Sequence, residues 1–122
     1  MHDRDVAERY WAGRTDRSYA YRSMHDAGVT MVFGSDAPVA PLDPWITMAA
    51  AVTRARDGRP AWHPEQAVPV EVALASSSRS TIAVGERADL AVLDADPLDA
   101  GNLREMPVAA TMLGGRFTYD AL

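Results

Sequence analysis

The feature that most constrains the fold is an apolar and β-branched run over 29–33, followed by Gly34-Ser35-Asp36 and then Ala37-Pro38-Val39. The run has no helical period, so it predicts a strand over 29–33 that is buried on both faces. Proline at position 38 takes the backbone out of regular structure. Asp36 therefore lies just past the end of a predicted buried strand, where α/β folds place catalytic carboxylates. Aspartate before Ala-Pro is also common in turns, so spacing alone leaves Asp36 as either a catalytic residue or a turn residue.

Composition excludes several kinds of chemistry from this chain. All 12 basic residues are arginine, and neither lysine nor cysteine occurs among the 122 residues. This excludes Schiff-base and phosphate-loop lysines, carboxylated-lysine metal bridges, thiolate nucleophiles and thiolate metal sites. A net charge of −5 with scattered arginines lacks the basic patch of nucleic-acid-binding proteins. An apolar fraction of 48% with 24% charged residues is typical of one folded domain.

No segment of the sequence suggests a membrane protein. The first residues are charged and lead into no apolar signal region, and the most apolar run, Trp45 to Val52, is too short to cross a bilayer. We therefore expect a soluble, cytoplasmic protein with neither a membrane nor a nucleic acid as partner.

Turn residues and hydrophobic periodicity predict helices on both sides of the strand. The charged stretch 1–13 is expected to be irregular, after which Thr15 resembles an N-cap and Gly28 a C-terminal stop. Asp43-Pro44 is a strong helix start, because aspartate is a favoured N-cap and proline a favoured first helical residue. The predicted helices cover 16–27, 44–56 and 70–78, and a short turn of helix is expected within 62–66.

After residue 80 the sequence becomes richer in β-forming residues. A strand is predicted over 88–94, and a hairpin over 108–119 turns at Gly114-Gly115. The chain is therefore expected to divide into an α/β piece, 1–80, and a β piece, 81–122.

The residues that commonly bind metals are not spaced as a site within this chain. His2, His25 and His63 form neither an H-x-H nor an H-E-x-x-H motif. The acidic residues between 89 and 99 match no calcium-loop spacing. His25 is expected on the surface, whereas His63 either lies in a surface loop or reaches a pocket.

Several segments carry a family resemblance, and their order and spacing make coincidence a poor explanation. They are Tyr19-Ala20-Tyr21-Arg22-Ser23, Ala27-Gly28-Val29, Phe33 to Val39, Asp43-Pro44-Trp45, Ala51-Val52-Thr53-Arg54, Pro64-Glu65-Gln66, Gly85 to Pro97 and Val108 to Gly115. From about Tyr10 to Tyr119 the chain resembles the C-terminal quarter of amidohydrolase family 3, within the metal-dependent hydrolase superfamily.

The resemblance implies a fold and a site. The fold is α/β: a C-terminal fragment of a (β/α)8 TIM barrel, with 29–33 as its last strand, plus part of a composite β-sandwich. Asp36 matches the aspartate after strand eight, a metal-centre residue that acts as general base and then general acid. In this family a metal-activated water attacks an amide-type carbonyl, and the aspartate passes the proton to the leaving nitrogen. Ser35, Pro38 and Val39 are the expected substrate-proximal residues.

The other family ligands would lie upstream of Met1. The resemblance thus implies a divalent metal, with zinc expected, in the full-length family but not bound by this chain alone. The first hypothesis is the C-terminal part of a metal-dependent amidohydrolase that hydrolyses a non-peptide C–N bond of a small amide-type substrate, inactive without the missing part. The alternative is a non-catalytic remnant or split subunit that acts as an oligomerising or partner-binding module, through self-association or pairing with an N-terminal part.

Overall fold

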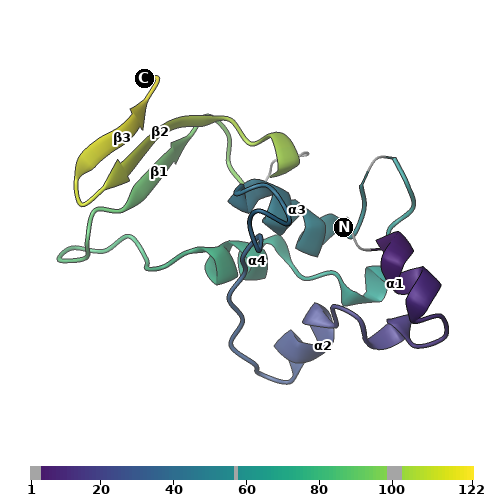
Figure 1. Ribbon diagram of the computed structural model, residues 1–122. Helices are drawn as coiled ribbons and strands as arrows, with labels where there is room; N and C mark the ends of the chain where they lie inside the picture. Colours follow the sequence, from purple (N-terminus) through teal and green to yellow (C-terminus); the bar gives the residue numbers. More distant parts are fainter. Residues whose placement is uncertain (1–3, 57, 99–102) are drawn as a thin grey trace.

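The chain folds as an α/β structure with a small antiparallel sheet at one end and short helices at the other (Figure 1). The computed structural model describes residues 4–56, 58–98 and 103–122. Helices α3 (Pro44–Thr53) and α4 (Val70–Ser77) lie between the sheet and the N-terminal helices α1 (Arg4–Tyr10) and α2 (Tyr21–Asp26). The sheet has three strands in the order β1-β2-β3.

Helix α3 begins where the sequence predicts, because Asp43 caps it. One Asp43 carboxylate oxygen accepts hydrogen bonds from the backbone N–H of Trp45 at 2.8 Å and of Ile46 at 3.3 Å. The helix ends at Thr53 rather than at 56, since Arg54 adopts a left-handed conformation with φ of 55°. The early end turns the chain toward the loop before Trp62, whose backbone N–H donates to the Arg54 carbonyl at 2.8 Å.

The main core lies between α3 and α4. Met48 and Ala51 of α3 pack with Val68 and Ala73, and all four are buried. Helix α4 matches the predicted 70–78 to within one residue. A short 3-10 turn, η2 (Pro64–Gln66), precedes it at the predicted place.

The prediction of a strand over 29–33 is wrong, because these residues pair with no strand among the described residues. Residues 29–36, called here the extended segment, belong to no strand of the described sheet. A strand needs a neighbour to complete its backbone hydrogen bonds, and one bond fastens this segment to α4, from the Phe33 N–H to the Ser76 carbonyl at 2.8 Å.

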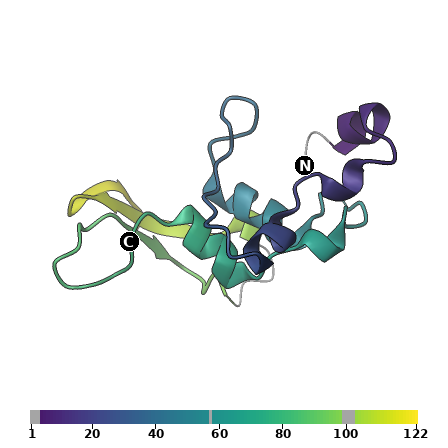
Figure 2. The same cartoon turned by 90° about the horizontal axis from the view of Figure 1, so that it is seen from below.

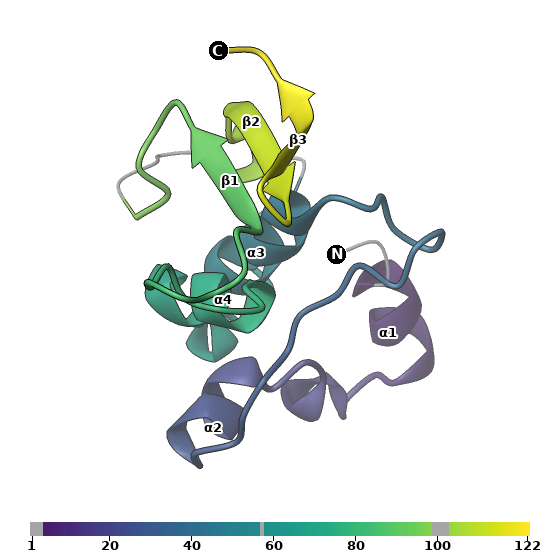
Figure 3. The same ribbon diagram turned by 90° about the vertical axis from the view of Figure 1, so that its left-hand side faces the viewer.

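Burial of the extended segment on both faces is also wrong. Met31 and Phe33 pack against the main core, whereas the Val32 side chain between them is 86% exposed. Alternation of this kind is the period of an extended backbone with one buried face. The segment therefore has strand-like geometry without strand partners, and Figure 3 shows it running from α2 past α3.

The predicted helix over 16–27 is interrupted in its first half. A 3-10 turn, η1 (Thr15–Arg17), is separated from α2 by Tyr19, which has a left-handed φ of 55°. Thr15 is not the N-cap residue, and no side-chain cap hydrogen bond starts η1. The C-terminal stop is right, because Gly28 has a φ of 75° and its N–H donates to the His25 carbonyl at 2.9 Å.

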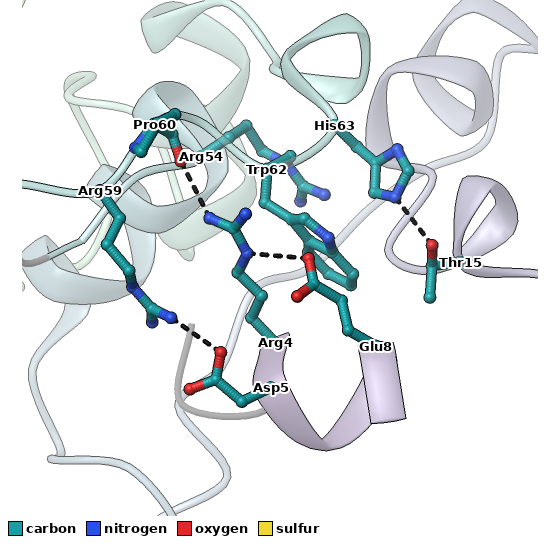
Figure 4. A network of polar contacts seen from close by, with 9 residues as sticks. All are labelled: Arg4, Asp5, Glu8, Thr15, Arg54, Arg59, Pro60, Trp62 and His63. Carbon is teal, nitrogen blue, oxygen red and sulfur yellow. Dashed lines mark hydrogen bonds and ion pairs between the residues drawn. The ribbon is translucent and has the colours of Figure 1, made fainter. Parts of the chain in front are cut away.

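Helix α1 forms where an irregular stretch was predicted, and long-range contacts explain it. Arg4 donates to the Pro60 carbonyl at 3.0 Å and pairs with Glu8 at 3.0 Å (Figure 4). Arg59 pairs with Asp5 at 2.8 Å. These contacts join α1 to a loop more than 50 residues away in the sequence, so local patterning does not reveal them.

The sheet contains the predicted strand and hairpin with slightly different bounds. Its strands are β1 (Leu90–Leu93), β2 (Val108–Leu113) and β3 (Arg116–Asp120). Gly114 and Gly115 form the turn with φ of 57° and 77°, the positive pair that a type I′ hairpin requires. Asp89 fastens this turn by accepting the Gly114 N–H at 2.7 Å.

A second small core attaches the sheet to the helices. Leu103 of the 3-10 turn η3 (Leu103–Glu105) and Met106 pack on Ala49 of α3, with Leu93 of β1 beside them. The sequence of 102–106 fits either a short helical or an irregular link; the structure has the 3-10 turn from Leu103, and residue 102 lies outside the described residues.

Loss of the α3 cap should weaken the whole fold, because α3 contributes to both cores. We expect Asp43→Ala to lower the free energy of unfolding by about 1 kcal/mol, measured by urea denaturation. Asp43→Asn is the matched control, since asparagine caps helices as well as aspartate does. Equal losses from both substitutions would contradict the cap interpretation.

Candidate functional site

A groove of about 560 Å³ lies between the extended segment and α3. The extended segment lines it along its full length, and Ile46, Thr47 and Ala50 of α3 line the facing wall. The rings of Tyr19, Tyr21 and Phe33 add aromatic surface. The groove therefore combines apolar walls with the backbone of a segment that pairs with no strand among the described residues.

Asp36 lines this groove at the end of the extended segment. Its φ of 54° is left-handed, a conformation that aspartate tolerates better than most residues. Its carbonyl accepts the Val39 N–H at 2.9 Å, which closes a tight turn. Asp36 is thus a turn residue whose exposed side chain adjoins a cavity, so the two interpretations of the sequence are compatible.

The other predicted site residues are only partly brought together. Ser35 is half-buried and lines the groove beside Asp36, and Val39 lines it although its side chain is 65% exposed. Pro38 is exposed and is not among the lining residues. Figure 2 shows why, because the loop after the extended segment projects away from the rest of the molecule before α3 begins.

Among the described residues, the groove contains one carboxylate that could bind a metal, which is less than a complete ligand set. Within residues 4–56, 58–98 and 103–122, no group of three or more His, Cys, Asp or Glu side chains could hold a metal ion. Asp36 is the one acidic residue among those lining the groove. Because a catalytic zinc takes about three protein ligands, Asp36 suits such a site only as one member of a larger set.

His63 does not reach the groove. It lies between two segments. Its Nε2 is 3.3 Å from the Thr15 hydroxyl (Figure 4), and its Nδ1 is 3.0 Å from a Glu65 carboxylate oxygen. The Glu65 backbone N–H and then His63 hold the pKa of the Glu65 carboxyl below its usual value. His63 thus joins η1 to η2, and the loop interpretation of this residue is the right one.

Arg54 is the residue of this region that sequence reasoning missed. Only 2% of it is exposed, although it lines the groove. Its guanidinium lies 5.7 Å from the Tyr21 ring centre and 5.9 Å from that of Trp62, and its Nε donates to the Trp62 carbonyl at 3.1 Å. Arginines are mostly exposed, so no local pattern marks this one as buried.

The Arg54 guanidinium is incompletely satisfied. Its Nη2 atom is buried and has no hydrogen-bond partner among the described residues. Burial lowers the pKa of Arg54, and nearby Tyr21, Glu65 and Tyr19 oppose that shift. Burial likewise raises the pKa of the Tyr21 phenol, against the effect of the Arg54 charge.

Comparison with known proteins decides the family. A protein-family model described as "Amidohydrolase family" matches residues 2–119, nearly the whole chain. The chain belongs to the amidohydrolase family. This match confirms the resemblance predicted from the sequence, and it is consistent with a C-terminal segment of the family. No solved structure gives a significant match to the chain.

Two curated relatives of this amidohydrolase family member are much longer than it. It is 33% identical over 127 residues to "N-substituted formamide deformylase" of Arthrobacter pascens, covering 90% of this chain and 23% of that protein. It is 27% identical over 132 residues to "Putative amidohydrolase YtcJ" of Bacillus subtilis (strain 168), covering 94% of this chain and 25% of that protein. The chain therefore spans about a quarter of the length of these relatives.

The helices of this family member do not resemble membrane spans. No helix among the described residues is both long enough and apolar enough to cross a bilayer.

The buried Tyr21 phenol makes alkaline stability a test of the groove's electrostatics. Its pKa is raised above 10.0 in the folded chain, so above that pH the unfolded state loses this proton first and folding weakens. We expect the free energy of unfolding to fall more steeply above pH 10 in the unmodified chain than in Tyr21→Phe.

Tyr119→Phe provides the matched control, because the Tyr119 side chain is 52% exposed. Urea denaturation between pH 8 and 11, at fixed ionic strength, measures the slopes. Identical slopes for Tyr21→Phe and the unmodified chain would contradict a raised Tyr21 pKa.

Proposed function

We propose that this chain is the C-terminal part of a metal-dependent amidohydrolase that hydrolyses a non-peptide, amide-type C–N bond. The observation that carries the proposal is the family match over residues 2–119 together with Asp36 at the end of the groove-lining segment. The chain spans about a quarter of its relatives, so the remaining site residues would come from outside it.

The extended segment is proposed to be the last strand of a (β/α)8 barrel, with α3 as the helix that follows it. Its geometry supports this, because Met31 and Phe33 pack on the helical core while Val32 is exposed on the opposite face. In a closed barrel, neighbouring strands would complete its backbone hydrogen bonds. Strands β1 to β3 are proposed to form part of a composite β-sandwich.

Asp36 is the proposed catalytic and metal-centre residue. A divalent metal, with zinc expected, would activate water in the complete site, where Asp36 supplies one oxygen ligand. The Asp36 carboxylate would accept a proton from the attacking water and donate it to the leaving nitrogen. Its exposed position at a turn leaves the carboxylate free to approach a substrate that lies in the groove.

A small amide-type molecule is the proposed substrate, and N-substituted formamides are the first to test, given the name of one relative. Ser35 and Val39 are proposed to contact it because both line the groove beside Asp36. Pro38 is proposed to shape the turn near the substrate. The proposed location of the complete enzyme is the cytoplasm.

Asp36→Asn in the complete protein to which the chain belongs tests this function. We expect kcat for hydrolysis of N-substituted formamides and other small N-acyl amides to fall by at least about 100-fold, because the amide side chain cannot accept the proton. Asp26→Asn is the matched control, since Asp26 is an exposed aspartate that pairs with Arg22 at 2.8 Å on α2. An active Asp36→Asn protein would contradict the proposed role.

A second candidate function is a non-catalytic module that associates with itself or with a partner. It is favoured by exposed apolar side chains along and after the extended segment: Val32 is 86% exposed, Val39 65% and Leu42 88%. Exposed apolar surface next to an unpaired backbone edge commonly marks an interface. The missing part of the barrel or a second copy of the chain could cover it.

Size-exclusion chromatography with light scattering tests this alternative on the purified chain. We expect a dimer or larger oligomer, and we expect Val32→Asp to shift it toward monomer because a charge would be buried in the interface. Val84→Asp, also at a highly exposed valine but outside this segment, is the control. A monomeric unmodified chain at about 100 μM would contradict self-association, since stable interfaces associate well below that concentration.

A further inference from the structure

The buried guanidinium of Arg54 is charged but lacks an ionic partner within the described residues. None of the ion pairs among the described residues includes Arg54, and its Nε donates to a neutral carbonyl, that of Trp62. A buried charge without a counter-ion is costly. The two rings beside it, those of Tyr21 and Trp62, compensate only in part through cation–π attraction.

The unsatisfied atom identifies the kind of group that is missing. Nη2 is a donor, so its partner must be an acceptor, and a charged acceptor gives the stronger bond to a guanidinium. A singly charged anion would neutralise the Arg54 charge, whereas a phosphate dianion would bury a second, uncompensated charge. A carboxylate meets both requirements.

The groove provides room for the rest of such a ligand. Arg54 lines it together with the rings of Tyr19, Tyr21 and Phe33. The Tyr19 ring centre lies 6.1 Å from those of both Tyr21 and Trp62, the two rings beside the guanidinium, and Tyr19 is 40% exposed. Arg54 and Tyr19 both line the groove, so a ligand in the groove would lie beside them.

We propose that Arg54 is a carboxylate-binding subsite that holds a small molecule whose apolar or aromatic part lies in the groove beside Tyr21 and Phe33. The Arg54 Nε bond to the Trp62 carbonyl orients the guanidinium, and Nη2 donates to the ligand carboxylate. The site uses neither Asp36 nor a metal ion. It is therefore independent of the proposed hydrolytic function and can be tested on this chain.

Isothermal titration of the purified chain with phenylacetate tests the subsite, with phenylacetamide as the neutral isostere. We expect phenylacetate to bind with a dissociation constant of about 1 mM or tighter and phenylacetamide at least about tenfold more weakly. Inorganic phosphate is expected to give no binding. Equal affinities for phenylacetate and phenylacetamide, no binding of phenylacetate, or binding of phosphate as tight as that of phenylacetate would overturn the proposal.

Substitution then assigns the binding to Arg54. We expect Arg54→Gln to weaken phenylacetate at least about tenfold and to remove the preference over phenylacetamide. Arg59→Gln is the matched control, because Arg59 pairs with Asp5 at 2.8 Å and does not line the groove. Circular dichroism checks that each variant is folded, and if Arg54→Gln is unfolded, the phenylacetate and phenylacetamide affinities of the unmodified chain decide. Unchanged phenylacetate binding by folded Arg54→Gln would overturn the assignment.

Discussion

One backbone hydrogen bond, from the Phe33 N–H to the Ser76 carbonyl at 2.8 Å, determines where the candidate site lies. It fastens the extended segment to α4 and so places Phe33 and Met31 on the main core. The groove then forms between this segment and α3. Asp36 follows Phe33 by three residues and lines the groove where the backbone turns left-handed. The candidate site thus lies along a segment that packs on the main core through Met31 and Phe33 and pairs with no strand among the described residues.

Local chemistry explains the parts of the fold that sequence reasoning predicts well. Asp43 next to proline specifies a helix start without reference to the rest of the chain, and Gly114-Gly115 specifies a hairpin turn in the same way. The docking of α1 on the loop at Pro60 is a contact distant in sequence, so local patterning does not predict this helix. Local patterning likewise does not predict the left-handed Tyr19 that interrupts the helix expected over 16–27. The run over 29–33 has the composition of a buried strand, but pairing requires a neighbouring strand that the described residues do not supply.

Sequence reasoning likewise identifies one residue of the candidate site and misses another. Asp36 stands out in the sequence because a carboxylate follows an apolar run and because that pattern resembles a known family, to which the chain belongs. Arg54 does not stand out, since its burial results from the left-handed turn at the end of α3 and from the rings of Tyr21 and Trp62. A family resemblance therefore points to the carboxylate Asp36 more readily than to the buried arginine Arg54.

Asp36 is proposed to be one ligand of a metal site that is completed from outside the described residues. Metal analysis of the purified 122-residue chain by mass spectrometry, after dialysis against zinc, tests this claim most directly. A single carboxylate in a groove without histidine ligands holds zinc weakly, so the account predicts far less than one zinc ion per chain. One tightly held zinc ion per chain, lost in Asp36→Asn, would show that this chain contains a complete metal site and would contradict the account.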